Sequence, residues 1–153
     1  MRKLILFLSS NAGLGYAPFA SGTVGTLAGI PIFYLIHSWP WWLFLVTFMA
    51  LLFLSFWVAD AAGQIYGVAD DGRIVIDELI GYLVTVAFLP WSWPVAILGF
   101  FWFRLFDILK PQPARWFDTN LKHGVGVVLD DFIAGIYGAL ALRLTLWLFN
   151  LTP

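Results

Sequence analysis

The spacing and length of apolar segments constrain this 153-residue chain most strongly. Five such segments follow one another, at residues 26–36, 41–58, 78–89, 94–106 and 132–149. Only the second and fifth approach the roughly 20 residues that a helix needs to cross a bilayer, and the others are short or interrupted. Hydrophobic residues make up 61% of the chain and charged residues only 11%, whereas charged residues are about a quarter of soluble domains. Backbone in lipid must satisfy its own hydrogen bonds, and the alternating pattern of a barrel is absent. We therefore expect one all-α domain, residues 1–153, folded as a polytopic membrane helix bundle with about four to five membrane helices, some short or broken.

The charged residues occupy only some of the connections between these segments. The turns at 37–40 and 90–93 lack formal charge and contain Trp and Pro, which is typical of an aromatic belt at the membrane interface. The other connections contain seven of the eight basic residues, Arg143 being the exception. The positive-inside rule makes that side cytoplasmic. The apolar run at 4–8 is shorter than the about 7–15 residues of a signal peptide, so we expect the N-terminus to be retained.

All nine acidic residues lie between Asp60 and Asp131, most of them beside the ends of apolar segments. Carboxylates next to a membrane core are costly unless they are paired, solvated or bound to a metal. Helix capping would explain one acidic pair at a helix start. Two pairs, each expected to open a membrane helix on the charged face, favour joint binding of a hard cation such as Mg²⁺. The predicted metal ligands are Asp77, Glu78, Asp130 and Asp131, with Asp70, Asp71 and Asp118 as weaker candidates.

Residues 104–118 form the densest polar stretch. Arg104 and Asp107 are three residues apart and should share a helix face, and Pro111 should end that helix. The basic side chains here either anchor the chain at the interface or bind phosphate oxygens. One arginine guanidinium can bind two such oxygens at once. The predicted phosphate-binding residues are Thr23, Arg104, Lys110 and Arg115.

Three smaller features have a structural and a functional interpretation. Thr23 precedes the first apolar helix, where it either caps the helix or helps to bind an anion. Gly25 and Gly29 are spaced as in a close helix contact. His123 is the only histidine expected on the charged face, as a general acid or base or as an interfacial residue without a special role. A net charge of −1 gives no general attraction to nucleic acid, and the lack of cysteine excludes disulfides and thiolate chemistry.

Four ordered stretches carry a family resemblance. They are ASGTVGTLAGIP (20–31), DGRIVIDELIG (71–81), FRLFDILKPQPARWFD (103–118) and GVGVVLDDFIAG (124–135). Through them the chain resembles the phosphatidylglycerophosphatase A family of bacterial membrane enzymes. The resemblance implies Mg²⁺-dependent removal of the terminal phosphate from phosphatidylglycerophosphate, giving phosphatidylglycerol, at the cytoplasmic side of the bacterial inner membrane. His123 stands where the family usually has glycine and Thr119 where it often has arginine, and both departures bear on substrate preference.

The resemblance and the residue pattern together suggest roles for the polar side chains. The predicted catalytic residues are Asp77, Glu78, Asp107 and Asp131. Asp107 is expected to orient Arg104 or to join the ligands of Mg²⁺, while attack by water and a covalent aspartyl-phosphate are both left open. The alternatives are a cation transporter or channel, which would place the acids at mid-membrane depth, and a lipid-binding protein without activity. The expected partners are the lipid substrate and the bilayer, without nucleic acid, and the sequence does not indicate an oligomeric state.

Overall fold

The computed structural model describes residues 1–121 and 123–151, so Lys122, one of the basic residues of the charged side, lies outside them. Within these residues the secondary structure is entirely helical, as predicted. The helices are α1 (Arg2–Ser9), the 3-10 turn η1 (Leu14–Tyr16), α2 (Ser21–Thr26), α3 (Gly29–Ile36), α4 (Trp41–Tyr66), α5 (Ile76–Thr85), α6 (Trp93–Leu109), α7 (Ala114–Asn120) and α8 (Gly124–Leu148). The first apolar segment is therefore divided between α2 and α3, which confirms that some of the helices are short or broken.

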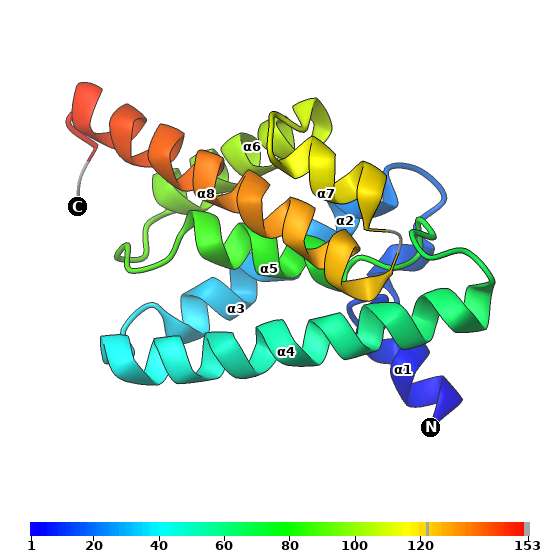
Figure 1. Cartoon of the computed structure of the whole chain (residues 1–153). Helices are drawn as coiled ribbons and strands as arrows, with labels where there is room; N and C mark the ends of the chain where they lie inside the picture. The colour runs from blue at the N-terminus through cyan, green and yellow to red at the C-terminus, as the bar shows by residue number, and fades with distance from the viewer. Residues whose placement is uncertain (122, 152–153) are drawn as a thin grey trace.

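Within the described residues, α4 and α8 are the two helices that are long and apolar enough to cross a membrane. They contact each other and run in opposite directions (Figure 1). Only 33% of the most apolar part of α4 is buried inside the protein, compared with 50% for α8. The outer surface of α4 exposes large side chains such as Trp42, Phe53 and Trp57. An apolar surface of this extent suits contact with lipid.

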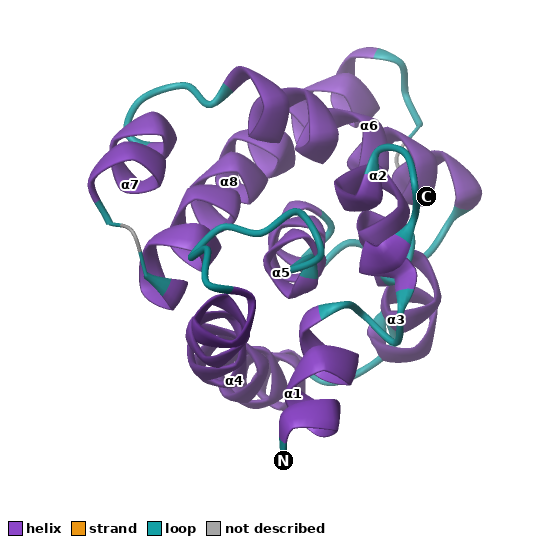
Figure 2. Cartoon of the chain, turned by 90° about the vertical axis from the view of Figure 1, so that its right-hand side faces the viewer, coloured by secondary structure: helices purple, strands orange, loops and turns teal. Residues whose placement is uncertain are grey.

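Helix α5 is short and lies in the centre of the bundle, surrounded by the other helices (Figure 2). It packs most extensively on α8. A Cβ atom at Gly135 of α8 would overlap the carbonyl oxygen of Gly81, so the small residues let the two backbones approach closely. The Thr85 hydroxyl also lies 3.0 Å from the Gly81 carbonyl and 3.2 Å from the Gly135 carbonyl, to which it donates. This close contact fixes the position of the first turn of α5 relative to α8.

The predicted separation of charged and uncharged connections is borne out by the arrangement of the chain. The end of α4, the segment that leads to α5 and the start of α8 lie at one end of the bundle (Figure 1). The turn between α3 and α4 and the end of α8 lie at the other end. We call the first of these the charged end, since it contains the segment with Asp70, Asp71 and Arg73.

Two predicted helix starts were wrong. The N-cap of α2 is Ala20, and Thr23 lies inside that helix. Helix α8 begins at Gly124, so Asp130 is its seventh residue, roughly 9 Å from the start at 1.5 Å per residue. The Gly124 N–H donates to Oδ1 of Asp60 on α4 at 3.2 Å. The start of α8 is therefore capped by a distant helix, which a local reading of the sequence does not reveal.

Candidate active site

A polar cavity of about 140 Å³ opens at the charged end, beside the first turn of α5 and the second turn of α8. Six predicted site residues line it, namely Asp77, Glu78, Asp107, Lys110, Asp130 and Asp131. The other lining residues are Ser21, Asp70, Gly72, Ile74 and Val127. Residues from α2, α5, α6, α8 and the connections beside them thus converge on one space, although they are up to 110 residues apart in the chain, from Ser21 to Asp131.

The acids of α5 and α8 are buried around this cavity. Asp77 and Glu78 lie in the first turn of α5, as predicted, where the helix dipole favours negative charge. Asp77 is 6% exposed and Asp131 is 3% exposed. One oxygen on each of Asp77, Glu78 and Asp131 has no hydrogen-bond partner among the described residues. A buried carboxylate oxygen without a donor is costly, so these three oxygens are suited to a cation or to the donors of a bound ligand.

Arg104 lies between two of these acids. Its Nη1 is 3.2 Å from Oε1 of Glu78 and 2.8 Å from Oδ2 of Asp107. The contact with Asp107 confirms that the two residues share a face of α6. The Nε and Nη1 atoms of Arg104 make no hydrogen bond of good geometry within the described part of the chain. The guanidinium therefore keeps unused donors of the kind that bind phosphate oxygens, although it is buried against the wall of the cavity and does not itself line it.

The glycine-rich helix α2 closes the site from another side. A Cβ atom at Gly22 would overlap Oε1 of Glu78, and one at Gly25 would lie 2.8 Å from Oε2 of the same carboxylate. Only glycine allows α2 to approach Glu78 this closely. Gly29 likewise packs on the ring of Tyr82, which agrees with the predicted helix contact.

Lys110 joins the cavity to the helix α7. It follows the last residue of α6, as expected from Pro111, and has a positive φ of 43°. Its Nζ donates to Oδ1 of Asp118 and to Oδ2 of Asp130, both at 2.7 Å. Burial lowers the pKa of the Lys110 ammonium, but the carboxylates of Asp130 and Asp118 outweigh that effect and raise the pKa above its usual value. The other oxygen of Asp130 accepts the N–H of Asp131 at 3.0 Å, so Asp130 is engaged on both sides.

The structure does not bring every predicted residue to the cavity. Thr23 is half-buried within α2 and Arg115 is exposed on α7, and neither lines it. Arg104 does not line it either, and reaches the site only through its ion pairs with Glu78 and Asp107. Ser21 lies there instead, with its hydroxyl donating to the Gly72 carbonyl at 2.5 Å. His123 precedes α8 and lines a separate pocket of about 280 Å³. Ser21 lies in the same glycine-rich motif as Thr23, so the motif indicated the region but not the residue.

The carboxylate oxygens at the cavity are of the chemical type that Mg²⁺ prefers as ligands. Among residues 1–121 and 123–151, no three His, Asp or Glu side chains are grouped at the spacing of a ready-made metal site. Magnesium is usually held by one or two carboxylates, with water and substrate phosphate completing its shell. The unpartnered carboxylate oxygens of Asp77, Glu78 and Asp131 are possible metal ligands of that type. The predicted ligand set therefore stays a prediction.

The comparisons with known proteins agree on one family. A family model described as phosphatidylglycerophosphatase A matches residues 7–146. The phosphatidylglycerophosphatase A of Escherichia coli (strain K12) is 39% identical over 135 residues, covering 86% of this chain and 77% of the relative. That of Haemophilus influenzae (strain Rd) is 37% identical over 140 residues, covering 89% and 85%. A protein of Bacteroides thetaiotaomicron whose name proposes a phosphatidylinositol-3-phosphatase is 34% identical over 162 aligned positions, covering 96% of both chains. No solved structure is significantly similar to the chain. Since the family model and two named relatives cover most of its length, the chain belongs to the phosphatidylglycerophosphatase A family, as the resemblance predicted.

Proposed function

We propose that this chain is a Mg²⁺-dependent lipid phosphatase that hydrolyses the terminal phosphate of phosphatidylglycerophosphate to give phosphatidylglycerol. The observation that carries the proposal is the convergence of six predicted polar residues on one cavity, with buried carboxylate oxygens left unpartnered beside Arg104. Two relatives are named for this activity, and the name of the third proposes another lipid phosphatase. The names therefore support a lipid phosphomonoester as the class of substrate.

The bundle suits a substrate that stays in the membrane. With α4 and α8 crossing the bilayer, the acyl chains remain in lipid while the terminal phosphate reaches the charged end. The basic residues of the connections favour a cytoplasmic position for that end. We therefore place the protein in the bacterial inner membrane, with the cavity open to the cytoplasm.

The residues that line the cavity, together with Arg104, which pairs with Glu78 and Asp107 of its wall, divide into two groups by charge. Arg104 and Lys110 neutralise the phosphate oxygens, and the carboxylates of Glu78 and Asp107 hold the Arg104 guanidinium in place. The buried acids Asp77, Glu78 and Asp131, with Asp130 beside them, would hold Mg²⁺ directly or through water. When bound, Mg²⁺ would polarise the phosphoryl group and add positive charge where charge develops.

The free oxygens of Asp77 and Asp131 are the groups best suited to start the attack on the phosphate. Either carboxylate can accept the proton of an attacking water molecule. Either can also attack phosphorus itself to give an aspartyl-phosphate, which water then hydrolyses. The geometry is compatible with both routes.

The test is phosphate release from phosphatidylglycerophosphate by the purified full-length protein in lipid nanodiscs, with and without Mg²⁺. We expect release with Mg²⁺ only, and a loss of roughly 100-fold or more in kcat for Asp131→Asn and Glu78→Gln, in line with the removal of a charged group from an active site. Asp71→Asn is the matched control, because Asp71 pairs with Arg73 at 2.6 Å and does not line the cavity. No release from the wild type would refute the function, and full activity in both cavity variants would refute the metal assignment.

A further inference from the structure

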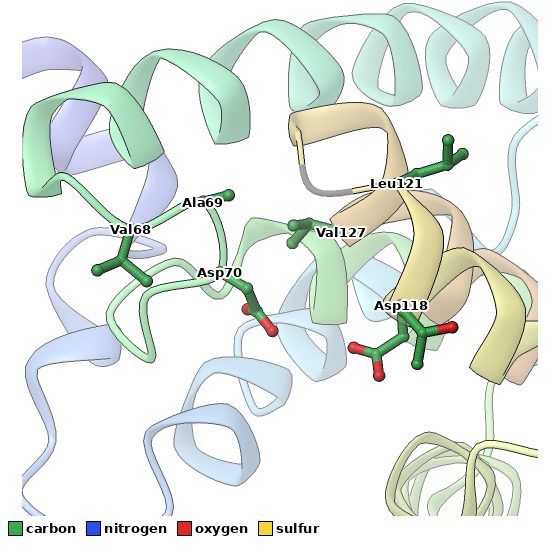
Figure 3. A pocket seen from close by; sticks show the side chains of 7 residues that line it. Val68, Ala69, Asp70, Asp118, Leu121 and Val127 are labelled. Atoms are coloured by element: carbon green, nitrogen blue, oxygen red, sulfur yellow. The ribbon is translucent and has the colours of Figure 1, made fainter.

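A larger pocket, of about 350 Å³, lies directly beside the cavity. Its polar walls are Asp70, Asp118 and Thr119, and its apolar walls include Val68, Leu121 and Val127. Asp70 and Val127 line the pocket and the cavity alike, so the two spaces are adjacent. Figure 3 shows Asp70 on the segment between α4 and α5 and Asp118 on α7, with both carboxylates directed toward the space between them.

The polar wall of this pocket offers hydrogen-bond acceptors. Asp118 accepts a bond from Lys110 through Oδ1, while its Oδ2 and both oxygens of Asp70 accept none from the described residues. The Thr119 hydroxyl donates to the Arg115 carbonyl and accepts from the Asn120 side-chain amide, both at 2.9 Å, so the two carboxylates are the main acceptors of this wall. Two carboxylates repel a phosphate and accept hydrogen bonds from hydroxyl groups. The pocket therefore favours the alcohol part of a phosphate ester over the phosphate.

We propose that this pocket binds the hydroxyl-bearing alcohol to which the scissile phosphate is attached, with Asp70 and Asp118 as specificity-determining residues. The inference rests on the proposed function, since it places the phosphate in the adjoining cavity. For phosphatidylglycerophosphate the alcohol is the bridging glycerol, whose secondary hydroxyl donates to Asp70 or Asp118 while Val68 and Leu121 face its carbon atoms. Lys110 connects the two subsites, because its ammonium contacts Asp118 at the pocket and Asp130 at the cavity.

A chemical analogue gives a direct test. In it the secondary hydroxyl of the bridging glycerol is replaced by hydrogen, and the rest of the lipid is unchanged. A hydrogen bond to a charged group contributes about 1.5–3 kcal/mol, so wild-type kcat/KM should be roughly 10- to 100-fold lower for the deoxy lipid. In Asp70→Asn the kcat/KM values for the two lipids should differ by no more than about three-fold, mainly because kcat/KM for the natural lipid falls.

The ratio of kcat/KM for the natural lipid to kcat/KM for the deoxy lipid separates a loss of hydroxyl recognition from a general structural effect. Asp118→Asn also removes a partner of Lys110, so activity on both lipids should fall, with the natural lipid losing more. Asp71→Asn is the matched control, because Asp71 lies on the same segment as Asp70. It should retain the wild-type ratio, because its carboxylate bonds to Arg73 and does not line the pocket. The inference is overturned if the wild type does not distinguish the two lipids, or if both pocket variants retain the wild-type ratio.

A binding measurement separates this inference from the proposed function. Titration calorimetry of the wild type would compare glycerol 3-phosphate with 1,3-propanediol phosphate, which lacks the secondary hydroxyl. Tighter binding of glycerol phosphate, lost in Asp70→Asn, would support the pocket even if the wild type released no phosphate from the lipid. Equal binding of the two compounds would contradict the pocket assignment even in an active enzyme.

Discussion

Replacement of Lys110 by methionine should destabilise the protein by leaving a buried charge without its partner. Asp130 is 5% exposed, and its Oδ2 lies 2.7 Å from the Lys110 Nζ. Methionine keeps most of the apolar stem and removes the ammonium. Breaking a fully buried pair costs about 3–5 kcal/mol. Because the Lys110 side chain is itself 28% exposed, we expect a smaller loss of roughly 2–4 kcal/mol. The pair with Asp118, whose side chain is 32% exposed, should contribute less than about 1 kcal/mol.

The melting temperature of the purified protein reports this loss. For a chain of this size about 1 kcal/mol corresponds to roughly 2–4 °C, so Lys110→Met should melt about 4–16 °C below the wild type. The folded pKa of Lys110 is raised above its unfolded value. Its stabilisation is therefore complete below the unfolded pKa of about 10.4 and is lost only as pH rises through the folded pKa. The Lys110 ammonium is thus fully charged in measurements at neutral pH.

The double variant tests the reasoning. Adding Asp130→Asn to Lys110→Met removes the stranded charge, so the double variant should regain more than half of the lost melting temperature while staying inactive. Asp118→Asn alone should melt within about 3 °C of the wild type. If the two substitutions add, so that the double variant melts lower than Lys110→Met, the charge on Asp130 is not what destabilises the single variant.

Three further outcomes follow from the contacts. Gly22→Ala should lower kcat by roughly ten-fold or more by displacing Glu78, and wild-type activity in this variant would contradict the close approach of α2. Arg143→Met removes a 2.6 Å bond to the Ala87 carbonyl at the opposite end of the bundle, so it should lower the melting temperature by a few degrees with kcat within two-fold, and a large loss of activity would contradict that separation. Treatment with EDTA should abolish phosphate release and Mg²⁺ should restore it better than Ca²⁺, which needs six to eight ligands; unchanged release in EDTA would refute the metal requirement.

The elements set by local sequence were predicted well. The length and polarity of the apolar segments led to the helical class and to α4 and α8 as the longest helices. The spacing of Arg104 and Asp107 predicted that they share a face of one helix, where they form an ion pair, and Pro111 predicted the end of that helix. Each of these features depends on residues within one continuous segment of the chain, where hydrophobicity, periodicity and proline geometry decide the structure.

Features set by contacts between distant segments were missed. The start of α8 depends on a hydrogen bond from Gly124 to Asp60, 64 residues earlier. Ser21 was not selected because its approach to Gly72 depends on how α2 packs against the segment before α5. The pairing of Lys110 with Asp130 likewise depends on the contact of α6 with α8. The acids and bases were thus identified individually, while their partners required the fold.

The packing beneath the cavity bears on the alternative of a cation transporter or channel. A conduction path would have to continue from the buried acids along the contact between α5 and α8. That contact is filled directly below Asp131, because Cβ atoms at Gly81 and Gly135 would overlap the Phe103 ring and the Gly81 carbonyl. Phe103 is fully buried, and the Thr85 hydroxyl bonds across the same contact. Two backbones packed without room for a methyl group leave no space for an ion, since even one water molecule needs a wider gap. The carboxylates are therefore accessible from the charged end alone along this contact, which suits a phosphatase that takes its substrate at the membrane surface better than a protein that moves ions across the bilayer.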